Sequence, residues 1–301
     1  FDATVTGASN GAVAPTTDRR VTYNFYSDNS GQQGEALANQ PTGIGTYWVE
    51  AVYEGDDNYK PKTSEPVQFT ISPAALKVEA TGYDEIYNGQ PHDPAAITVT
   101  GVNGVISSGY TISYAKKTDD QPPEADDEWR ADLQVKDVAD SGDYWFKVVI
   151  DEDDSYNAYI GSVKVTIDPK QLTVTKDVTP TKVYDGTTDA TKNVKFTHID
   201  TDIEGEKVTA DLVSAVYNSP NANEDNFITI TYQLTAGDNT TLANYSLDGK
   251  TVTGEKMSET VDKVGDTKVG ITPASITVAI NDQEKVYDGQ SLSIENPVQD
   301  T

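Results

Sequence analysis

The chain repeats a small set of motifs at a nearly constant interval. An Ile-X-Pro motif begins at residues 71, 167 and 271, so its copies lie 96 and 104 residues apart. Each copy is followed by a β-type run and, further on, by a turn of the form Tyr-Asn/Asp-Gly. Self-similarity at a fixed period indicates one folding unit copied along the chain. Such a chain favours functions that depend on reach, spacing or multivalent contact.

The tyrosine turn is expected to serve the backbone. Glycine supplies a positive φ angle, asparagine or aspartate tolerates that conformation, and the tyrosine anchors the turn against the core. Sugar binding at this motif is the weaker alternative. The residues of the three turns are Tyr87, Asn88, Gly89, Tyr184, Asp185, Gly186, Tyr287, Asp288 and Gly289.

Strand signals dominate the sequence. Apolar and polar residues alternate in 67–71, 163–167 and 228–232, which is the period of a sheet with one solvated face. Clusters of Asn, Asp, Gly, Pro and Ser separate these runs, and no window of a dozen residues shows helical periodicity. The sequence therefore predicts an all-β fold of tandem immunoglobulin-like β-sandwich repeats in an elongated array. Repeats of the β-grasp type are the alternative.

The prolines of the Ile-X-Pro motif mark the boundaries of the repeats, because proline cannot donate to a β-ladder. We expect complete repeats at 72–167 and 168–271, an incomplete repeat at 1–71, and the start of a further repeat at 272–301. Because Phe1 lies within a repeat, we expect this sequence to be a fragment of a longer protein. The two incomplete ends allow an exchange of strands between molecules, although a monomer is the favoured expectation.

Composition excludes several classes of partner. The chain has 22 basic and 49 acidic residues, a formal net charge of −27, which repels nucleic acid and anionic membrane surfaces. No stretch approaches the roughly 18 apolar residues of a membrane span. There is no cysteine, so disulfide, thiol and Cys-metal chemistry are excluded.

The three tryptophans are the candidate ligand contacts. Trp48 and Trp145 follow Tyr47 and Tyr144 at equivalent positions of two repeats, which is compatible with glycan stacking. Neighbouring residues on a strand face opposite sides, however, so core or junction packing is the favoured interpretation. Trp129 has no counterpart in another repeat and is the better candidate for an exposed contact.

Calcium is the only cofactor that the sequence leaves open. The acidic loops at 56–57 and 151–154 could gather oxygen ligands, but neither has the alternating carboxylates of a dedicated calcium loop. Solvated acidic turns are therefore favoured over a metal site. An isopeptide cross-link between a lysine, such as Lys77 or Lys182, and a late asparagine is a further hypothesis.

Catalysis has little support in this sequence. His92 and His198 are the only histidines, and they do not occupy equivalent positions. The sequence has no nucleophile elbow, cysteine nucleophile, phosphate-binding glycine loop or histidine-based zinc pattern. We therefore expect a protein that is not an enzyme.

These motifs resemble the MBG and YDG repeat domains of Gram-positive bacterial surface adhesins, which occur alongside mucin-binding modules. The MBG-type features are Tyr87-Asn88-Gly89-Gln90-Pro91, Gly142-Asp143-Tyr144 and Ile167-Asp168-Pro169. The YDG-type features are Lys182-Val183-Tyr184-Asp185-Gly186-Thr187-Thr188 and Asn244-Tyr245, with Lys285-Val286-Tyr287-Asp288-Gly289 opening another such repeat. The resemblance implies an extracellular parent attached to the cell wall and a role without catalysis.

Two functions follow from the resemblance. The favoured one is an extended stalk that presents a distal binding region. The alternative is that the repeats themselves bind host mucin or glycan with low affinity and gain avidity from copy number. Accessory modules of a secreted carbohydrate-active enzyme are a third, more distant reading.

Overall fold

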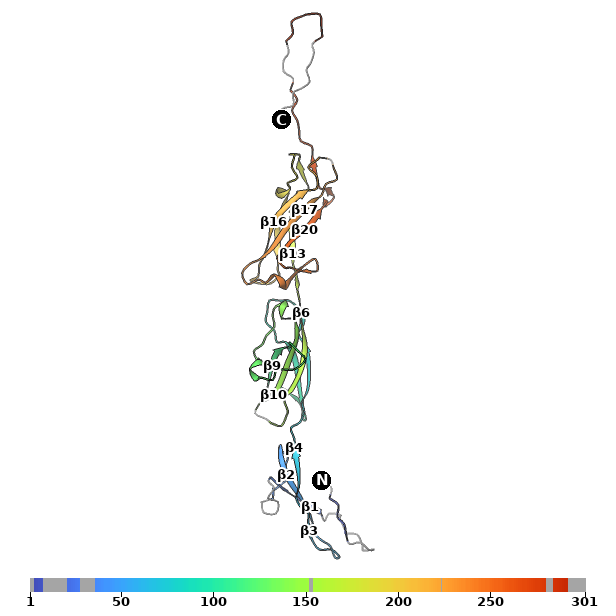
Figure 1. Cartoon of the computed structure of the whole chain (residues 1–301), viewed down its shortest axis with the longest axis vertical. Coiled ribbons are helices and arrows are strands. Elements are labelled where there is room, and N and C mark those ends of the chain that lie inside the picture. Colours follow the sequence, from blue (N-terminus) through green and yellow to red (C-terminus); the bar gives the residue numbers. More distant parts are fainter. Residues whose placement is uncertain are drawn as a thin grey trace. The chain divides into compact units, whose positions relative to one another are not determined.

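The chain is described from a computed structural model. The structure describes residues 3–7, 21–27, 36–151, 154–222, 224–279 and 284–291. The chain divides into two compact units, and Figure 1 labels strands along it. Unit 1 comprises Phe1–Gln171, Asp202–Gly205 and Ala243–Val252, and unit 2 comprises Leu172–Thr201, Glu206–Leu242 and Thr253–Thr301.

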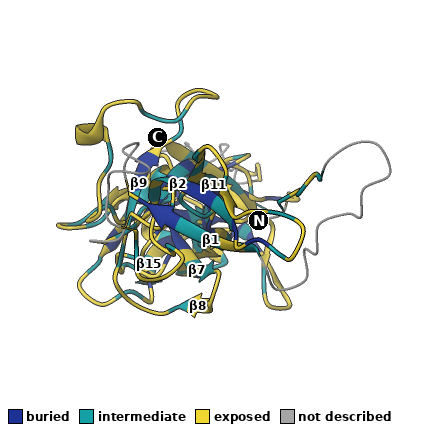
Figure 2. Cartoon of the chain, turned by 90° about the horizontal axis from the view of Figure 1, so that it is seen from below, coloured by how far each residue is buried: buried dark blue, intermediate teal, exposed yellow. Residues whose placement is uncertain are grey.

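The fold is all-β, as the sequence predicted, and its strands form several separate sheets. The described residues contain no α-helix, and the only helical elements in them are single 3-10 turns. No helix in this described part is long and apolar enough to cross a membrane. Buried side chains lie mainly on the strands, while the loops between them are largely exposed (Figure 2).

The first repeat, in unit 1, contributes one sheet. Its order is β1-β2-β3, and β4 also pairs with β2. Phe25, Val49 and Tyr53 are buried on this sheet. The strands are β1 (Val21–Tyr26), β2 (Gly45–Tyr53), β3 (Lys62–Thr63) and β4 (Val67–Ile71).

The second repeat, also in unit 1, has two sheets, of order β6-β11-β10-β9 and β5-β7-β8. Val99, Val135, Val148 and Val165 are completely buried. The strands are β5 (Lys77–Gly82), β6 (Asp84–Ile86), β7 (Ala95–Gly101), β8 (Gly104–Ile106), β9 (Tyr110–Lys116), β10 (Gly142–Ile150) and β11 (Tyr159–Asp168). The 3-10 turns are η2 (Asp126–Glu128) and η3 (Val138–Asp140).

Gly82 lies where the chain leaves the smaller sheet of the second repeat and enters the larger one. A Cβ atom at this position would overlap the backbone carbonyl of Lys164 on β11. The next turn is fixed by the Thr166 amide, which donates to the Tyr83 carbonyl at 2.8 Å. Only glycine allows this close approach of two backbones.

Unit 2 holds most of the third repeat. Its sheets have the orders β16-β17-β20, β13-β15, β14-β23 and β21-β22. Ala215, Ile228 and Ile230 are completely buried. The elements are β13 (Thr173–Val178), β14 (Thr181–Val183), η4 (Thr191–Asn193), β15 (Val194–Asp200), β16 (Val208–Tyr217), β17 (Ile228–Ala236), β20 (Lys256–Val261), β21 (Lys263–Val264), β22 (Thr267–Lys268) and β23 (Gly270–Thr272).

The second and third repeats share an unusual parallel pairing. In the second repeat, Ile167 of β11 lies opposite Glu85 of β6, and in the third repeat Ile271 of β23 lies opposite Lys182 of β14. In the third repeat an insertion, Asp262–Val269, divides the closing strand into β20 and β23. The Val269 amide donates to the Asp262 carbonyl at 2.8 Å and closes this insertion. The two repeats therefore have the same topology with different edges.

One segment of the third repeat belongs to unit 1. This segment, Ala243–Val252, is called the Asn-Tyr segment below. It begins within the 3-10 turn η5 (Leu242–Asn244) and contains β18 (Tyr245–Leu247) and β19 (Lys250–Thr251). These two strands form a sheet with β12 (Lys170–Gln171), in which Lys170 and Tyr245 lie opposite each other in a parallel pair.

Candidate functional site

Asn244 is a buried polar side chain of unit 1 with hydrogen bonds at both its oxygen and its nitrogen. It is 1% exposed. The Val138 amide donates to Asn244 Oδ1 at 2.9 Å, and Asn244 Nδ2 donates to Asp137 Oδ1 at 2.7 Å. A buried amide needs both a donor and an acceptor, and this loop supplies one of each. The bond to the carboxylate is of the stronger, charge-assisted kind.

The loop that receives Asn244 is shaped by its own carboxylates. Asp137 and Asp140 form a reciprocal capping box around η3. Asp140 Oδ2 accepts from the amides of Lys136 and Asp137, each at 2.9 Å. These bonds hold the turn in the shape that directs the Val138 amide toward Asn244.

Tyr245 packs against the tyrosine turn of the second repeat. Tyr245 is completely buried, and its ring meets the ring of Tyr87 edge to face with centroids 5.8 Å apart. Tyr87 is itself only 3% exposed. Tyr87, Asp137, Val138, Asn244 and Tyr245 are called the junction cluster below. Aromatic pairs of this geometry contribute about 0.5–1.5 kcal/mol beyond the area that they bury.

The junction cluster was not foreseen from the sequence. The sequence predicted only that Tyr87 anchors a turn and that Asn244-Tyr245 is a YDG-type feature. In the structure Tyr245 corresponds to Tyr156 of the second repeat, because Tyr156 forms a parallel bridge with Ala74, as Tyr245 does with Lys170. Nothing in the repeat pattern showed that Tyr245 would meet Tyr87.

The three tyrosine turns have the same hydrogen bond between a side chain and the backbone. In each turn, the side-chain oxygen of the Asn or Asp accepts a hydrogen bond of 2.9 Å from the backbone amide two residues later, which is an Asx turn. The glycines that follow have φ angles of +75°, +75° and +79°. The residues concerned are Asn88, Gly89, Asp185, Gly186, Asp288 and Gly289.

The tyrosines of these turns differ in burial, which the sequence did not anticipate. Tyr87 is 3% exposed, whereas Tyr184 is 46% and Tyr287 is 94% exposed. Anchoring against a core was expected at all three. It is found at Tyr87, where the Asn-Tyr segment covers the ring, and it is not found at the other two.

Lys182 stabilises the tyrosine turn of the third repeat by hydrogen bonds. Its Nζ donates to Asp185 Oδ1 at 2.9 Å, to Thr187 Oγ1 at 3.0 Å and to the Asp189 carbonyl at 2.9 Å. The Lys182 bond, with help from the Thr187 amide, lowers the pKa of Asp185 to about 2. The other lysine considered for a cross-link, Lys77, is exposed and pairs with Glu79 at 2.9 Å. Both ammonium groups thus face oxygen atoms.

Trp145 lies on the outer face of β10. Its neighbour Tyr144 is 3% exposed and donates from its hydroxyl to the Asp140 carbonyl at 2.7 Å, and burial raises the Tyr144 pKa. Lys117 Nζ lies 4.5 Å from the centroid of the Trp145 ring. The indole Nε1 of Trp145 is buried and has no acceptor among the described residues.

Trp129 and Trp48 are both partly buried. Trp129 Nε1 donates to the Pro123 carbonyl at 3.3 Å. Lys147 Nζ lies 5.5 Å from the Trp129 ring centroid and also pairs with Asp126 at 2.9 Å. Trp48 lies on β2 of the first repeat, opposite Tyr26 on β1. A sugar that stacked on Trp129 or Trp145 would meet a ring already contacted by lysine.

The acidic loops make local turns where the structure describes them. Asp56 Oδ1 accepts the amides of Asn58 and Tyr59, each at 2.8 Å, and Asp56 Oδ2 accepts the Tyr53 hydroxyl at 2.6 Å. Residues 152 and 153 of the second loop lie outside the described residues. Elsewhere, the described residues contain no group of three or more side chains suited to a metal ion.

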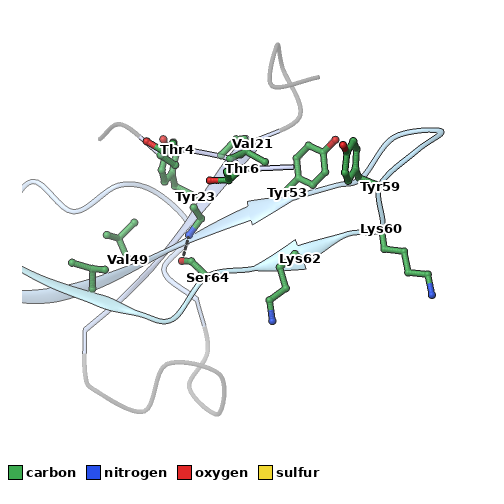
Figure 3. Close-up of a pocket in the computed structure, with 14 residues that line it drawn as sticks. Thr4, Thr6, Val21, Tyr23, Val49, Tyr53, Tyr59, Lys60, Lys62 and Ser64 are labelled. Carbon is green, nitrogen blue, oxygen red and sulfur yellow. Dashed lines mark hydrogen bonds between the residues drawn. The ribbon is translucent and has the colours of Figure 1, made fainter. Parts of the chain in front are cut away.

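The first repeat carries a cavity of about 610 Å³ (Figure 3). Its apolar wall is formed by one face of the sheet, and Ser64 Oγ accepts the Ala51 amide at 3.0 Å at its edge. The strand-exchange hypothesis would place residues of the 272–301 segment here, and it stays a prediction. The apolar and aromatic lining residues are Val5, Val21, Tyr23, Val49, Tyr53, Tyr59 and Val67.

The comparison with protein families identifies the third repeat. The profile of the YDG domain matches residues 168–254. The chain carries a YDG domain. The resemblance to YDG-type repeats is thereby confirmed for the third repeat, while the MBG type of the second repeat stays a prediction. The YDG match includes the Asn-Tyr segment together with β13–β17 of unit 2.

Several solved structures show a weak likeness to this chain. Three N-terminal domains of the outer capsid protein Hoc of bacteriophage RB49 are 14% identical, with coverage of 86% of this chain and 89% of that one and a TM-score of 0.26. Immunoglobulin domains 1–5 of Sidekick-1 are 12% identical, covering 84% and 54%, with a TM-score of 0.23. Domains 1–6 of the surface layer protein SbsC are 11% identical, covering 85% and 35%, with a TM-score of 0.23.

At this level of likeness, nothing about the activity of the YDG-containing chain follows from these structures. This chain spans about half or less of the Sidekick-1 and SbsC chains. The comparison with curated proteins returned no match.

Proposed function

We propose that this chain is part of the repeat region of a Gram-positive bacterial cell-surface adhesin, attached to the cell wall, where it acts as a stalk that presents a distal binding region. The YDG domain and the tandem all-β repeats support this role. The net charge of −27 would keep neighbouring chains apart and in solution.

The observation that carries the proposal is the junction cluster. A spacer transmits force and holds its reach only if successive repeats are linked by more than a flexible peptide. Here the YDG domain lends its Asn-Tyr segment to unit 1, where Asn244 and Tyr245 are buried against residues of the second repeat. Such interlocking is what a repeat protein uses to couple nearest neighbours.

Small-angle scattering on the 301-residue chain tests the stalk. We expect a particle several times longer than wide. When Asn244→Ala and Tyr245→Ala are combined, its maximum dimension should fall or the distribution of its dimensions should broaden. Ser155→Ala is the matched control, because Ser155 is the exposed counterpart of Asn244 in the second repeat. A compact particle, or a double variant with an unchanged profile, would argue against the proposal.

The second candidate function is weak binding of mucin or glycan by the repeats. Trp129 favours it, because an indole that is only partly buried beside Lys147 is a surface on which a sugar ring can stack. The test is binding of the intact chain to a mucin-coated surface and to a glycan array. Saturable binding that is abolished by Trp129→Ala and left intact by Trp48→Ala would favour glycan binding over a role as a stalk alone.

A further inference from the structure

We propose that unit 2 contains a docking site for the Asn-Tyr segment of a following YDG-type repeat, at the position where the second repeat holds Ala243–Val252. The inference deepens the proposed stalk function, because it makes the junction cluster a device that recurs along the chain. It is carried by four observations on unit 2 alone.

The first observation is the equivalence of two loops. In the second repeat Gly142 lies opposite Val165, and in the third Ile228 lies opposite Val261. These pairs occupy the same place in the two topologies. Residues 224–227 therefore correspond to residues 138–141, which include Val138, whose amide donates to Asn244; the counterpart of Asp137 lies outside the described residues. The backbones of the adjacent turns also match, because the Tyr87 amide donates to Asp168 and the Tyr184 amide to Thr272, both at 2.8 Å.

The second observation is a cavity at that loop. It has a volume of about 570 Å³ and lies between residues 224–227 on one side and the parallel pair β14–β23 with the insertion on the other. The residues lining it are Thr181, Glu224, Asp225, Asn226, Phe227, Asp262, Lys263, Lys268, Val269, Gly270, Ile271 and Thr272. In the second repeat, Asp137 and Val138 of the corresponding loop, and Tyr87 directly after β6, contact the Asn-Tyr segment.

The third observation is an unpaired polar atom in the wall of this cavity. Asn226 is 6% exposed, and its Oδ1 has no donor among the described residues. Its Nδ2 donates to the carbonyls of Asn221 and Glu224, each at 3.3 Å. The counterpart Asp140 accepts two amides. A buried acceptor without a partner is rare, and it indicates that a donor from outside unit 2 completes this site.

The fourth observation is the apolar surface beside the cavity. Val183 and Tyr184 pair with the backbone of the lining residue Thr272, and their side chains are 60% and 46% exposed. The lining residue Phe227 is 38% exposed. An Asn-Tyr segment would give Tyr184 the ring that Tyr245 gives to Tyr87. The ion pair between Lys268 and Asp225, 3.2 Å apart, borders the cavity, but it is exposed on both sides and is easily displaced.

The occupant is specified by the chain itself. Ile271-Thr272-Pro273 and Tyr287-Asp288-Gly289 open a further repeat of the same type. A repeat of this type has its own counterpart of Asn244-Tyr245, which in the third repeat lies 61 residues (245 − 184) after the turn tyrosine. We therefore assign the site to a covalently following repeat. Binding of such a segment from a separate molecule is an outcome that the experiment distinguishes.

The experiment lengthens the chain by repeating residues 168–271 directly after Ile271. Tyrosine nitration, read site by site with mass spectrometry, reports whether each turn is covered. We expect the nitration rate of Tyr184 to fall at least tenfold, to the rate of the covered Tyr87. The turn tyrosine of the added copy is the internal control and should stay reactive.

A second variant separates docking from nonspecific crowding. Replacing Asn244 and Tyr245 by alanine only in the added copy should restore fast nitration of Tyr184. Equal Tyr184 rates in the original and lengthened chains, with the added copy folded by circular dichroism, would overturn the proposal. So would protection that persists in the alanine variant.

A synthetic peptide of residues 240–252 covers the case in which the added copy does not fold. In excess over the 301-residue chain, it should slow nitration of Tyr184 but not of Tyr287, and a peptide with both alanines should not. No effect at millimolar peptide would overturn the proposal. Protection by peptide that is absent in a folded lengthened chain would instead indicate binding between molecules. A compact particle in scattering would refute the stalk while leaving this site measurable.

Discussion

Asn244→Asp is the most informative single change, because it keeps the shape of the side chain and replaces its amide NH2 group by the second oxygen of an ionisable carboxyl group. In the native protein Asn244 Nδ2 donates to Asp137 Oδ1 at 2.7 Å, while Asn244 Oδ1 accepts the Val138 amide at 2.9 Å. The variant keeps an acceptor for Val138. It replaces the donor to Asp137 by a second carboxylate at the same short distance, in a place where the native side chain is 1% exposed.

The size of the effect follows from the bond that is lost. A hydrogen bond to a charged group contributes about 1.5–3 kcal/mol, and two facing carboxylates add repulsion. We expect the variant to lose about 3 kcal/mol in the free energy of unfolding at pH 7. The introduced carboxyl has a raised pKa in the folded state, because its proton restores the bond to Asp137. The folded variant thus binds more protons than the unfolded one, and the loss shrinks as pH falls below about 5.

The assay is chemical denaturation together with amide hydrogen exchange of β18, at pH 7 and at pH 4.5. Each free energy of unfolding and each exchange rate is compared with that of the native chain at the same pH. Asn244→Ala should be destabilised similarly at both values, because it lacks the titrating group. Ser155→Ala should stay within about 0.5 kcal/mol of the native chain. A loss for Asn244→Asp that does not depend on pH, or no loss at pH 7, would refute the geometry of the junction cluster.

Three further changes test the rest of the structure. Gly82→Ala should lower the free energy of unfolding by about 2–3 kcal/mol, because the added methyl group meets the Lys164 carbonyl. In the same denaturation assay Gly43→Ala should be nearly neutral, because the nearest atom to its added methyl group is 3.7 Å away. The pKa of Asp185 is lowered to about 2, so the turn that its carboxylate holds should be intact above about pH 4 and should loosen as the pH falls toward 2. An NMR titration of the Thr187 amide would follow this loosening. A titration midpoint near pH 4 would contradict the expectation. Adding a chelator should leave the melting temperature within about 1 °C, and a rise of several degrees with millimolar calcium would revive the metal site.

The strand predictions succeeded because they depend on local chemistry. Alternation in 163–167 and 228–232 falls within β11 and β17. The positive φ angles of Gly89 and Gly186 follow from the turn residues themselves. The predicted burial of the turn tyrosines failed at Tyr184, because burial there depends on whether another part of the polypeptide covers the ring.

Other features needed the folded chain. The parallel pair between β14 and β23 joins residues about ninety positions apart, and no alternation pattern announces such a pairing. Trp145 and Trp129 could be placed on strand and loop from the sequence. The lysines that contact their rings could not, because those contacts arise between strands and loops whose spacing is set by packing.

The amino-acid sequence by itself determined that this protein consists of copied β modules, since period, turn chemistry and strand alternation are all written in neighbouring residues. Only the tertiary structure decided how one copy engages the next. Asn244 and Asp137 are 107 residues apart, and their bond forms because backbone pairing carries the Asn-Tyr segment to a loop whose carboxylate and amide match both ends of the Asn244 side chain. A side-chain amide has no preference of its own for that partner, so packing alone makes the choice.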